Sequence, residues 1–279
     1  MTAETTAPAG SLRPAITRPL LPVAARPLAW VLTACCAVIV AGLPVLFARH
    51  TGLDWLDRSV DPRIQAMYRA HHDLLSRLAL PGKPIPVATL IVIIAVTCLV
   101  TGRANGAVLA AVAVPVAVEL TEHVLKPLVG RTKLGFLSYP SGHTTTMFAL
   151  AAVLAVLMLN PPGWALTPVL RLIIPAAAVA LACVISTRVI GLGSHYFTDT
   201  IAGAAVGVGT VAATALVLDL PGPRRWLAAA DVRLRKLHAR RSRGALASTR
   251  PSTRAALPSS GKHPATATED GPTGGPAGR

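Results

Sequence analysis

The sequence has few charged and aromatic residues, which make up 14% and 4% of its 279 residues. Such low charge is unusual for a water-soluble globular domain and is typical of membrane proteins. Cysteine is also scarce, with four residues that show neither CxxC spacing nor a histidine at metal-ligand spacing. This excludes a cysteine-based metal or redox motif, and we expect Cys35, Cys36, Cys98 and Cys183 to be buried packing residues.

Long apolar blocks replace the missing charge, and 52% of the residues are hydrophobic. A bilayer core about 30 Å thick needs roughly 20 apolar residues per helix. A soluble helical domain would need polar stripes that these blocks lack. The sequence therefore predicts an all-α polytopic membrane protein with six transmembrane helices. The expected spans are residues 29–48, 85–101, 105–125, 144–159, 168–190 and 199–218.

Charge at the two ends predicts the orientation. Residues 1–28 hold three arginines against one glutamate, and the segment after Asp219 holds twelve Lys or Arg against three acids. The positive-inside rule places both termini in the cytoplasm. The lead precedes a span long enough to cross the bilayer, so we expect it to stay attached and not to be removed as a signal peptide.

The composition of the terminal segments does not support a packed hydrophobic core. We predict a disordered lead over 1–28, a basic amphipathic juxtamembrane segment over 219–243 and a disordered tail over 244–279. Basic residues in the juxtamembrane segment favour contact with the anionic inner leaflet. Nucleic-acid binding is the competing interpretation, but no stacking aromatics accompany the charge after Trp226, so we expect no nucleic-acid partner.

Three polar segments fall on the outer side in this topology. They are the first outer loop, with a predicted interfacial helix at about 55–80, the loop 126–143 and the turn 188–199. The polar residues of these sequence-distant segments should therefore meet at one membrane face.

The loop 126–143 has the features of a phosphate-binding site. Lys126, Arg131 and Lys133 place three cations in it, and Ser141 and Gly142 stand where the next helix begins. Amide groups at a helix start and nearby cations both favour an anion. The alternative is a serine helix cap beside a solvated basic loop, and these residues alone do not decide between the two.

The turn 188–199 contains a histidine and a carboxylate four residues apart. If the helix starts early, His195 and Asp199 share a face, and the carboxylate can bond one ring nitrogen. The other nitrogen is then available as a nucleophile. A simple helix cap is the alternative, but Arg188 beside the pair and His143 on the same membrane face favour a catalytic site.

The third span carries polar residues that also need an explanation. Glu119, Glu122, His123 and Lys126 recur at spacings of three and four, so they share one helical face. A carboxylate inside the membrane costs about 2.5–3.5 kcal/mol on insertion scales. Either Glu122 or His123 lines a headgroup pocket or pairs with a phosphate-binding cation, or both lie at the membrane interface next to Lys126.

Small residues give the sixth span a face for close packing. Gly203, Gly207 and Gly209 lie among alanines on this segment. Such a face packs helices closely, either inside the bundle or between subunits of a homo-oligomer.

These motifs resemble the type 2 phosphatidic acid phosphatase superfamily, which includes glucose-6-phosphatases and vanadium haloperoxidases. The family pattern has three parts, KxxxxxxRP, PSGH and SRxxxxxHxxxD. Pro140 to His143 match the second, and His195 to Asp199 match the end of the third. The resemblance covers about residues 90–218 and implies the helical bundle of the phosphatase and haloperoxidase type.

The chain departs from this pattern in its first and third parts. With Lys126 as the first lysine, Lys133-Leu134 stand at the Arg-Pro positions, so a point charge replaces a bidentate donor unless Arg131 substitutes. Thr187 replaces serine, and six residues separate Arg188 from His195 where five are usual. Glycines 191 and 193 would have to absorb the extra residue.

The resemblance implies a reaction without metal or cofactor. His195 would attack phosphorus and form a phosphohistidine, Asp199 would orient its ring, and His143 would protonate the leaving oxygen. Lys126, Lys133 or Arg131, Ser141, Gly142 and Arg188 would bind the phosphate oxygens. The expected substrate is a membrane lipid phosphate or pyrophosphate at the outer leaflet, with a polyprenyl carrier slightly preferred. A lipid phosphotransferase and a non-catalytic lipid transporter are the alternatives.

Overall fold

The structure is a computed structural model that describes residues 19–47, 55–78, 80–160 and 167–223, together with 225–226 and 229. Residues 1–18 and the tail 244–279 lie outside this part. The predicted juxtamembrane segment 219–243 is described only at its beginning.

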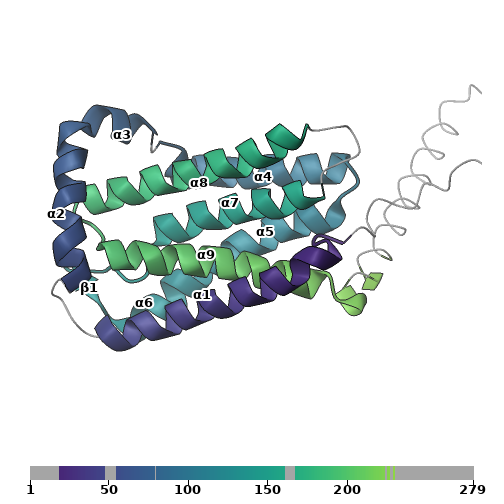
Figure 1. Cartoon of the computed structure of the whole chain (residues 1–279), viewed down its shortest axis with the longest axis horizontal. Helices are drawn as coiled ribbons and strands as arrows, with labels where there is room; N and C mark the ends of the chain where they lie inside the picture. Colours follow the sequence, from purple (N-terminus) through teal and green to yellow (C-terminus); the bar gives the residue numbers. More distant parts are fainter. Residues whose placement is uncertain are drawn as a thin grey trace, which may run out of the picture. The chain divides into compact units, whose positions relative to one another are not determined.

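Long apolar helices form a bundle in the described part of the chain (Figure 1). Five stretches are long and apolar enough to cross a membrane, and the 17-residue α4 is shorter. Each of the six predicted spans corresponds to one helix, so the predicted all-α membrane fold is confirmed, with five spans by the length criterion. The helices are α1 (Arg26–Phe47), α4 (Pro84–Val100), α5 (Ala104–Glu119), α7 (Gly142–Leu159), α8 (Pro168–Gly191) and α9 (Phe197–Leu218).

Local signals in the sequence set several helix ends. The Ser141 hydroxyl accepts the Thr144 amide at the start of α7, and Thr167 caps α8 in the same way. Helix α5 continues through a π-helical turn, η4 (Leu120–Leu125), into α6 (Lys126–Val129). Gly130 ends α6 in the left-handed conformation, with φ of 65°. A π turn changes the direction of the side chains that follow it, here toward the site described below.

Helix α9 packs against α1, α5 and α7. Its small-residue face is used inside the bundle: a Cβ atom on Gly203 would lie 2.6 Å from the Ser141 carbonyl oxygen, and one on Gly207 would meet the α7 backbone at Thr145. Gly209 faces Cys36 of α1. Of the two predicted uses of this face, the structure shows the internal one.

Two shorter helices follow the first span. α2 (Trp55–Ala70) runs across one end of the bundle of long helices (Figure 1) and contacts α8 and α9. α3 (His72–Leu78) and the short η3 (Leu80–Gly82) lead to α4. The single helix predicted at about 55–80 is therefore two helices separated at His71. α2 buries Asp57, Asp61 and Tyr68 against the bundle.

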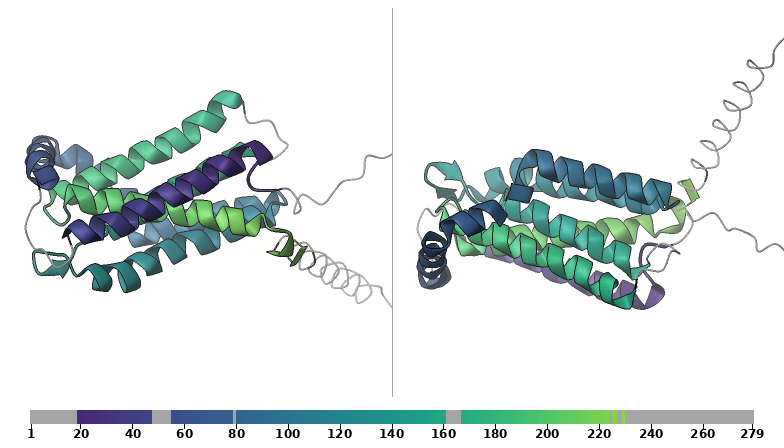
Figure 2. Two further views of the ribbon diagram at one scale, coloured as in Figure 1. Left: turned by 60° about the horizontal axis from the view of Figure 1, so that its bottom comes forward. Right: turned by 90° about the horizontal axis from the view of Figure 1, so that it is seen from above.

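The start of the described chain is tied to the end of α9. The amides of Leu20 and Leu21 donate to the Asp219 carboxylate at 2.8 and 2.9 Å, and the Asn160 amide donates to the Pro19 carbonyl. A short η2 (Val23–Ala25) then leads into α1, which lies beside α9 in both views of Figure 2. The prediction of disorder up to residue 28 is therefore wrong from residue 19 onward.

A small hairpin interrupts the helical pattern between α6 and α7. β1 (Thr132–Lys133) pairs antiparallel with β2 (Phe136–Leu137), and Lys133 faces Phe136. Leu134 and Gly135 both have positive φ, at 50° and 81°, as a type I′ turn requires. This turn, which the sequence analysis did not predict, fixes the position of Lys133.

Candidate active site

A cavity of about 810 Å³ joins the polar segments to an apolar wall. Its polar end is lined by His143, His195, Lys126, Lys133 and Glu122. Its apolar wall comes from α4 and α5, through Val87, Ala88, Ile91, Val114, Pro115 and Val118. With Gly142, five of the residues predicted for catalysis and phosphate binding therefore line one cavity.

The turn between α8 and α9 positions His195. Gly191 lets α8 approach the Tyr68 ring of α2, where any Cβ would overlap it, and Gly193 turns the chain with a φ of 73°. The Ser194 amide and hydroxyl both donate back to the Val189 carbonyl. These contacts accommodate the extra residue between Arg188 and His195.

The His195 ring is oriented by a backbone carbonyl. Its Nδ1 lies 2.8 Å from the Ser138 carbonyl oxygen. A carbonyl can only accept a hydrogen bond, so Nδ1 carries the proton and the Nε2 lone pair is available.

Asp199 lies next to this ring without a direct hydrogen bond to it. Its Oδ2 is 3.7 Å from His195 Nδ1 and accepts the Tyr196 amide at 2.9 Å, while its Oδ1 accepts from Arg131. The predicted bond between carboxylate and ring is therefore replaced by the Ser138 carbonyl, and Asp199 supplies negative charge nearby.

Arg131 is buried between carboxylates and does not line the cavity. Its side chain is 1% exposed, and it donates to Asp57 at 2.6 Å, to Asp199 at 2.8 Å and to the Thr198 hydroxyl at 2.7 Å. Of the four predicted phosphate-binding cations, Lys126 and Lys133 line the cavity, whereas Arg131 and Arg188 are not among its lining residues.

Two carboxylates of α2 were missed by the sequence analysis. Asp57 accepts the Thr198 amide at 2.9 Å, and Asp61 accepts the Phe197 amide at 3.0 Å. They therefore cap the first turn of α9, where helix amides lack helical partners. Acids four residues apart in the predicted interfacial helix were the available signal, but their partners lie 136 residues or more along the chain.

Lys133 stands where the first motif, KxxxxxxRP, has its arginine. Its Nζ donates to the His195 carbonyl at 2.7 Å, lies 3.8 Å from the centre of the Tyr196 ring and is 3.5 Å from Asp61. Burial lowers the pKa of Lys133 even though Asp61 and Asp199 oppose this shift. Burial likewise raises the pKa of Asp61, against the opposing effect of Lys133.

Lys126 and Glu122 form a close pair on the cavity wall. Two hydrogen bonds of 2.8 and 2.7 Å join the Lys126 ammonium to both carboxylate oxygens. Of the two predicted pocket residues, Glu122 lines the cavity. His123 instead pairs with Glu119 on an exposed part of the surface, at 2.8 Å.

The start of α7 contributes Gly142 and His143 to the cavity, while Ser141 is fully buried. The Ser141 hydroxyl accepts from the Thr144 hydroxyl as well as from its amide, and so acts here as a helix cap. Arg188, in the last turn of α8, lies within electrostatic range of His143. Its buried Nε has no hydrogen-bond partner among the described residues.

Fold and site together define a helical membrane protein in which two histidines and two lysines line a cavity with an apolar wall. Residues 86–220 match the model of the PAP2 superfamily, so this part of the chain belongs to that family and the predicted family is confirmed. The matched segment contains His143, His195 and Asp199. The protein is accordingly a phosphatase of the PAP2 type.

A solved structure from Bacillus subtilis, described as the first transmembrane PAP2 type phosphatidylglycerolphosphate phosphatase, has a similar fold. The two chains are 17% identical, and the alignment has a TM-score of 0.50. It covers 67% of this chain and 93% of that one. A search of curated proteins found no match.

Proposed function

We propose that the protein hydrolyses a lipid phosphate or pyrophosphate monoester at the extracytoplasmic membrane face through a phosphohistidine on His195. The cavity is the observation that carries this proposal. Its cationic end suits a phosphate headgroup, and its wall of α4 and α5 side chains suits a hydrocarbon chain. A ligand with both parts is a membrane lipid phosphate.

The reaction begins at the unprotonated nitrogen of His195. Nε2 bonds to phosphorus as the phosphorus–oxygen bond to the lipid breaks, and His143 gives its proton to the departing oxygen. The phosphorylated ring is cationic, and the adjacent Asp199 carboxylate stabilises that charge. His143 then takes a proton from water, whose oxygen bonds to phosphorus as the bond between phosphorus and Nε2 breaks. Phosphate is released and His195 is restored.

Cations and a backbone amide stabilise the negative charge of the phosphoryl oxygens. Lys133 and Lys126 line the cavity on different elements, and Gly142 brings a first-turn amide of α7 to the same space. The Arg188 Nε is a buried cationic donor that an anion can satisfy. These groups favour the phosphoryl group in the transition state, where negative charge is spread over its equatorial oxygens.

The test is a panel of lipid phosphates given to the purified full-length protein. It includes phosphatidate, a polyprenyl pyrophosphate and phosphatidylglycerol phosphate, the last because the similar solved structure is a phosphatase of that name. Release of inorganic phosphate from at least one lipid is expected, and the rate should persist in excess chelator. Loss of activity with chelator would contradict the proposed mechanism.

His195→Ala should lower the turnover number by at least about 10³-fold, because no other group replaces a covalent nucleophile. His72→Ala is the matched control, since His72 lies on α3 with a 58% exposed side chain. An active His195→Ala variant would rule out the phosphohistidine.

The same assay separates hydrolysis from phosphotransfer. An acceptor alcohol is added, and free phosphate is measured against the phosphorylated acceptor. Hydrolysis predicts free phosphate as the main product. Predominant transfer to the alcohol would assign the alternative activity to the same two histidines.

A further inference from the structure

Asp57 lies outside the segment that matches the family, yet it is fully buried beside the site. It belongs to α2, the helix that crosses the end of the bundle. Its Oδ1 accepts the Thr198 amide at 2.9 Å, and its Oδ2 accepts from Arg131 at 2.6 Å and from the Thr198 hydroxyl at 2.9 Å. It does not line the cavity, so any effect on the reaction is indirect.

The partners of Asp57 lead directly to His195. Arg131 uses one terminal nitrogen for Asp57 and the other for Asp199 at 2.8 Å. Asp199 lies 3.7 Å from the His195 ring. All three charged groups of this cluster, Asp57, Arg131 and Asp199, are 0–1% exposed, so solvent screens their interactions little.

The net charge of this cluster determines how strongly Asp199 can stabilise a positive charge on His195. Two carboxylates share one guanidinium, which leaves one negative charge in the group of three. Without the Asp57 charge, the positive charge of Arg131 would be balanced by Asp199, and the group would become neutral. A neutral group cannot stabilise the cationic ring of a phosphohistidine as a negative one does.

We propose that Asp57 is a positioning residue for catalysis: it holds and partly neutralises Arg131, so that Asp199 retains negative charge for the phosphorylated His195. This inference rests on the proposed phosphohistidine function. It adds an electrostatic role for α2, a helix of the first outer loop.

Asp57→Asn is the primary test, because asparagine keeps the shape and one carbonyl acceptor but removes the charge. The turnover number for lipid phosphate hydrolysis should fall about ten-fold or more, while KM changes less than about two-fold, since Asp57 does not touch the cavity. Asp73→Asn is the control. Its side chain is 94% exposed on α3, and its kinetics should match the wild type.

The second test removes the guanidinium as well. Adding Arg131→Gln to Asp57→Asn leaves Asp199 as the charged member of the cluster, and turnover should recover several-fold over Asp57→Asn alone. Purely structural damage predicts the reverse, with the double variant slower and less thermally stable than either single variant. An unchanged turnover number in Asp57→Asn would also overturn the inference.

If Asp57→Asn alone does not fold, the comparison uses Arg131→Gln with and without Asp57→Asn. Their turnover numbers should agree within about three-fold, because Asp57 acts through Arg131, and a further ten-fold loss would contradict this. A wild-type protein that releases no phosphate would instead refute the proposed function. The two failures are therefore distinguishable.

Discussion

The two lysines of the cavity have different partners at the scale of single residues. Lys126 is held by both oxygens of Glu122, whereas Lys133 has the carboxylate of Asp61 only at 3.5 Å and otherwise contacts a carbonyl and an aromatic ring. Burial accordingly outweighs the nearby charge and lowers the pKa of Lys133. Lys133 should therefore lose its proton at a lower pH than an exposed lysine.

This gives a pH dependence with a defined sign. As pH rises through the pKa of Lys133, below the ordinary value of 10.5, a positive charge leaves the cavity and KM for the lipid phosphate should rise. In Lys133→Arg the guanidinium stays protonated to about pH 12, so this increase in KM should disappear. The measurement is KM against pH for both proteins.

Lys83→Arg provides the control, because Lys83 is exposed at the start of α4 and does not line the cavity. It should keep the alkaline rise in KM. A rise that also persists in Lys133→Arg would show that another group, such as Lys126, is responsible.

The sequence alone predicted part of the residue set that lines the cavity. The predicted topology placed the loop 126–143 and the turn 188–199 on one side of the membrane, and His143, His195, Lys126 and Lys133 of these segments line one cavity. The motifs could not foretell that buried acids surround Arg131, since Asp57 is 74 residues away in the sequence. The hydroxyl of Ser141 likewise fits a phosphate ligand and a helix cap equally well until its neighbours are known.

At the scale of elements, the close contact between α9 and α7 depends on glycine, which has no side chain. A Cβ atom at position 207 would meet the Thr145 carbonyl and would lie 2.8 Å from the Ala149 amide nitrogen. Both are backbone atoms of α7, which cannot rotate away as a side chain can. The two helices that carry His143 and Asp199 are therefore held at close range by glycine.

Gly207→Ala should destabilise the protein, although alanine is the better helix former. The gain in helix propensity is at most about 1 kcal/mol, and overpacking against backbone costs about 1–3 kcal/mol. Thermal unfolding in detergent would measure the loss. Gly42→Ala on α1 is the matched control, because its Cβ would meet nothing within 4 Å, and it should be neutral or slightly stabilising.

The helices were more predictable than the segments between them. Hydropathy identified α1, α4, α5, α7, α8 and α9 because a bilayer imposes a length and an apolar surface. The break at His71, the π turn η4 and the hairpin at Leu134 and Gly135 depend on tertiary contacts or on single backbone conformations. Hydrophobic periodicity contains little information about these features.

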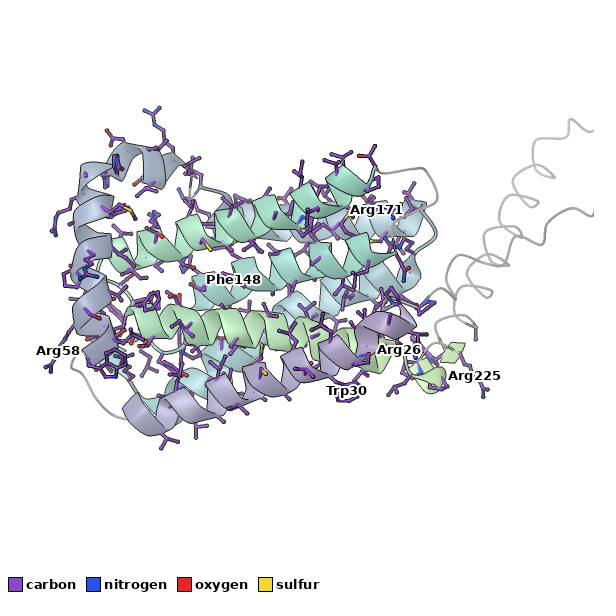
Figure 3. The ribbon with its side chains drawn as sticks, viewed as in Figure 1. Arg26, Trp30, Arg58, Phe148, Arg171 and Arg225 are labelled. Carbon is purple, nitrogen blue, oxygen red and sulfur yellow. The ribbon has the colours of Figure 1, made fainter. Side chains whose placement is uncertain are left out.

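The bundle formed by the described residues has two ends that differ in what they contain. The site and α2 lie at one end of the bundle, and the Asp219 contacts lie at the other. Figure 3 labels Arg58 at the first end, and Arg26, Arg171 and Arg225 at the second. The basic terminal segments of the sequence favour a cytoplasmic position for the second end.

Labelling of intact cells with an impermeant thiol reagent tests this orientation. In a background without the four native cysteines, Arg58→Cys should be labelled, because position 58 is exposed on α2 at the proposed outer face. Arg225→Cys, also exposed, should react only after the cells are opened. The reverse pattern would place the site in the cytoplasm.

The bonds from Leu20 and Leu21 to Asp219 join positions 199 and 198 residues apart. Of the spans that the structure describes, α1 is synthesised first and its main helical neighbour, α9, is synthesised last. The bundle therefore cannot reach its final packing while the ribosome is still making the middle spans. α1 therefore lacks its main packing contact until α9 has been synthesised, so the bundle assembles only after all of its described spans have been made.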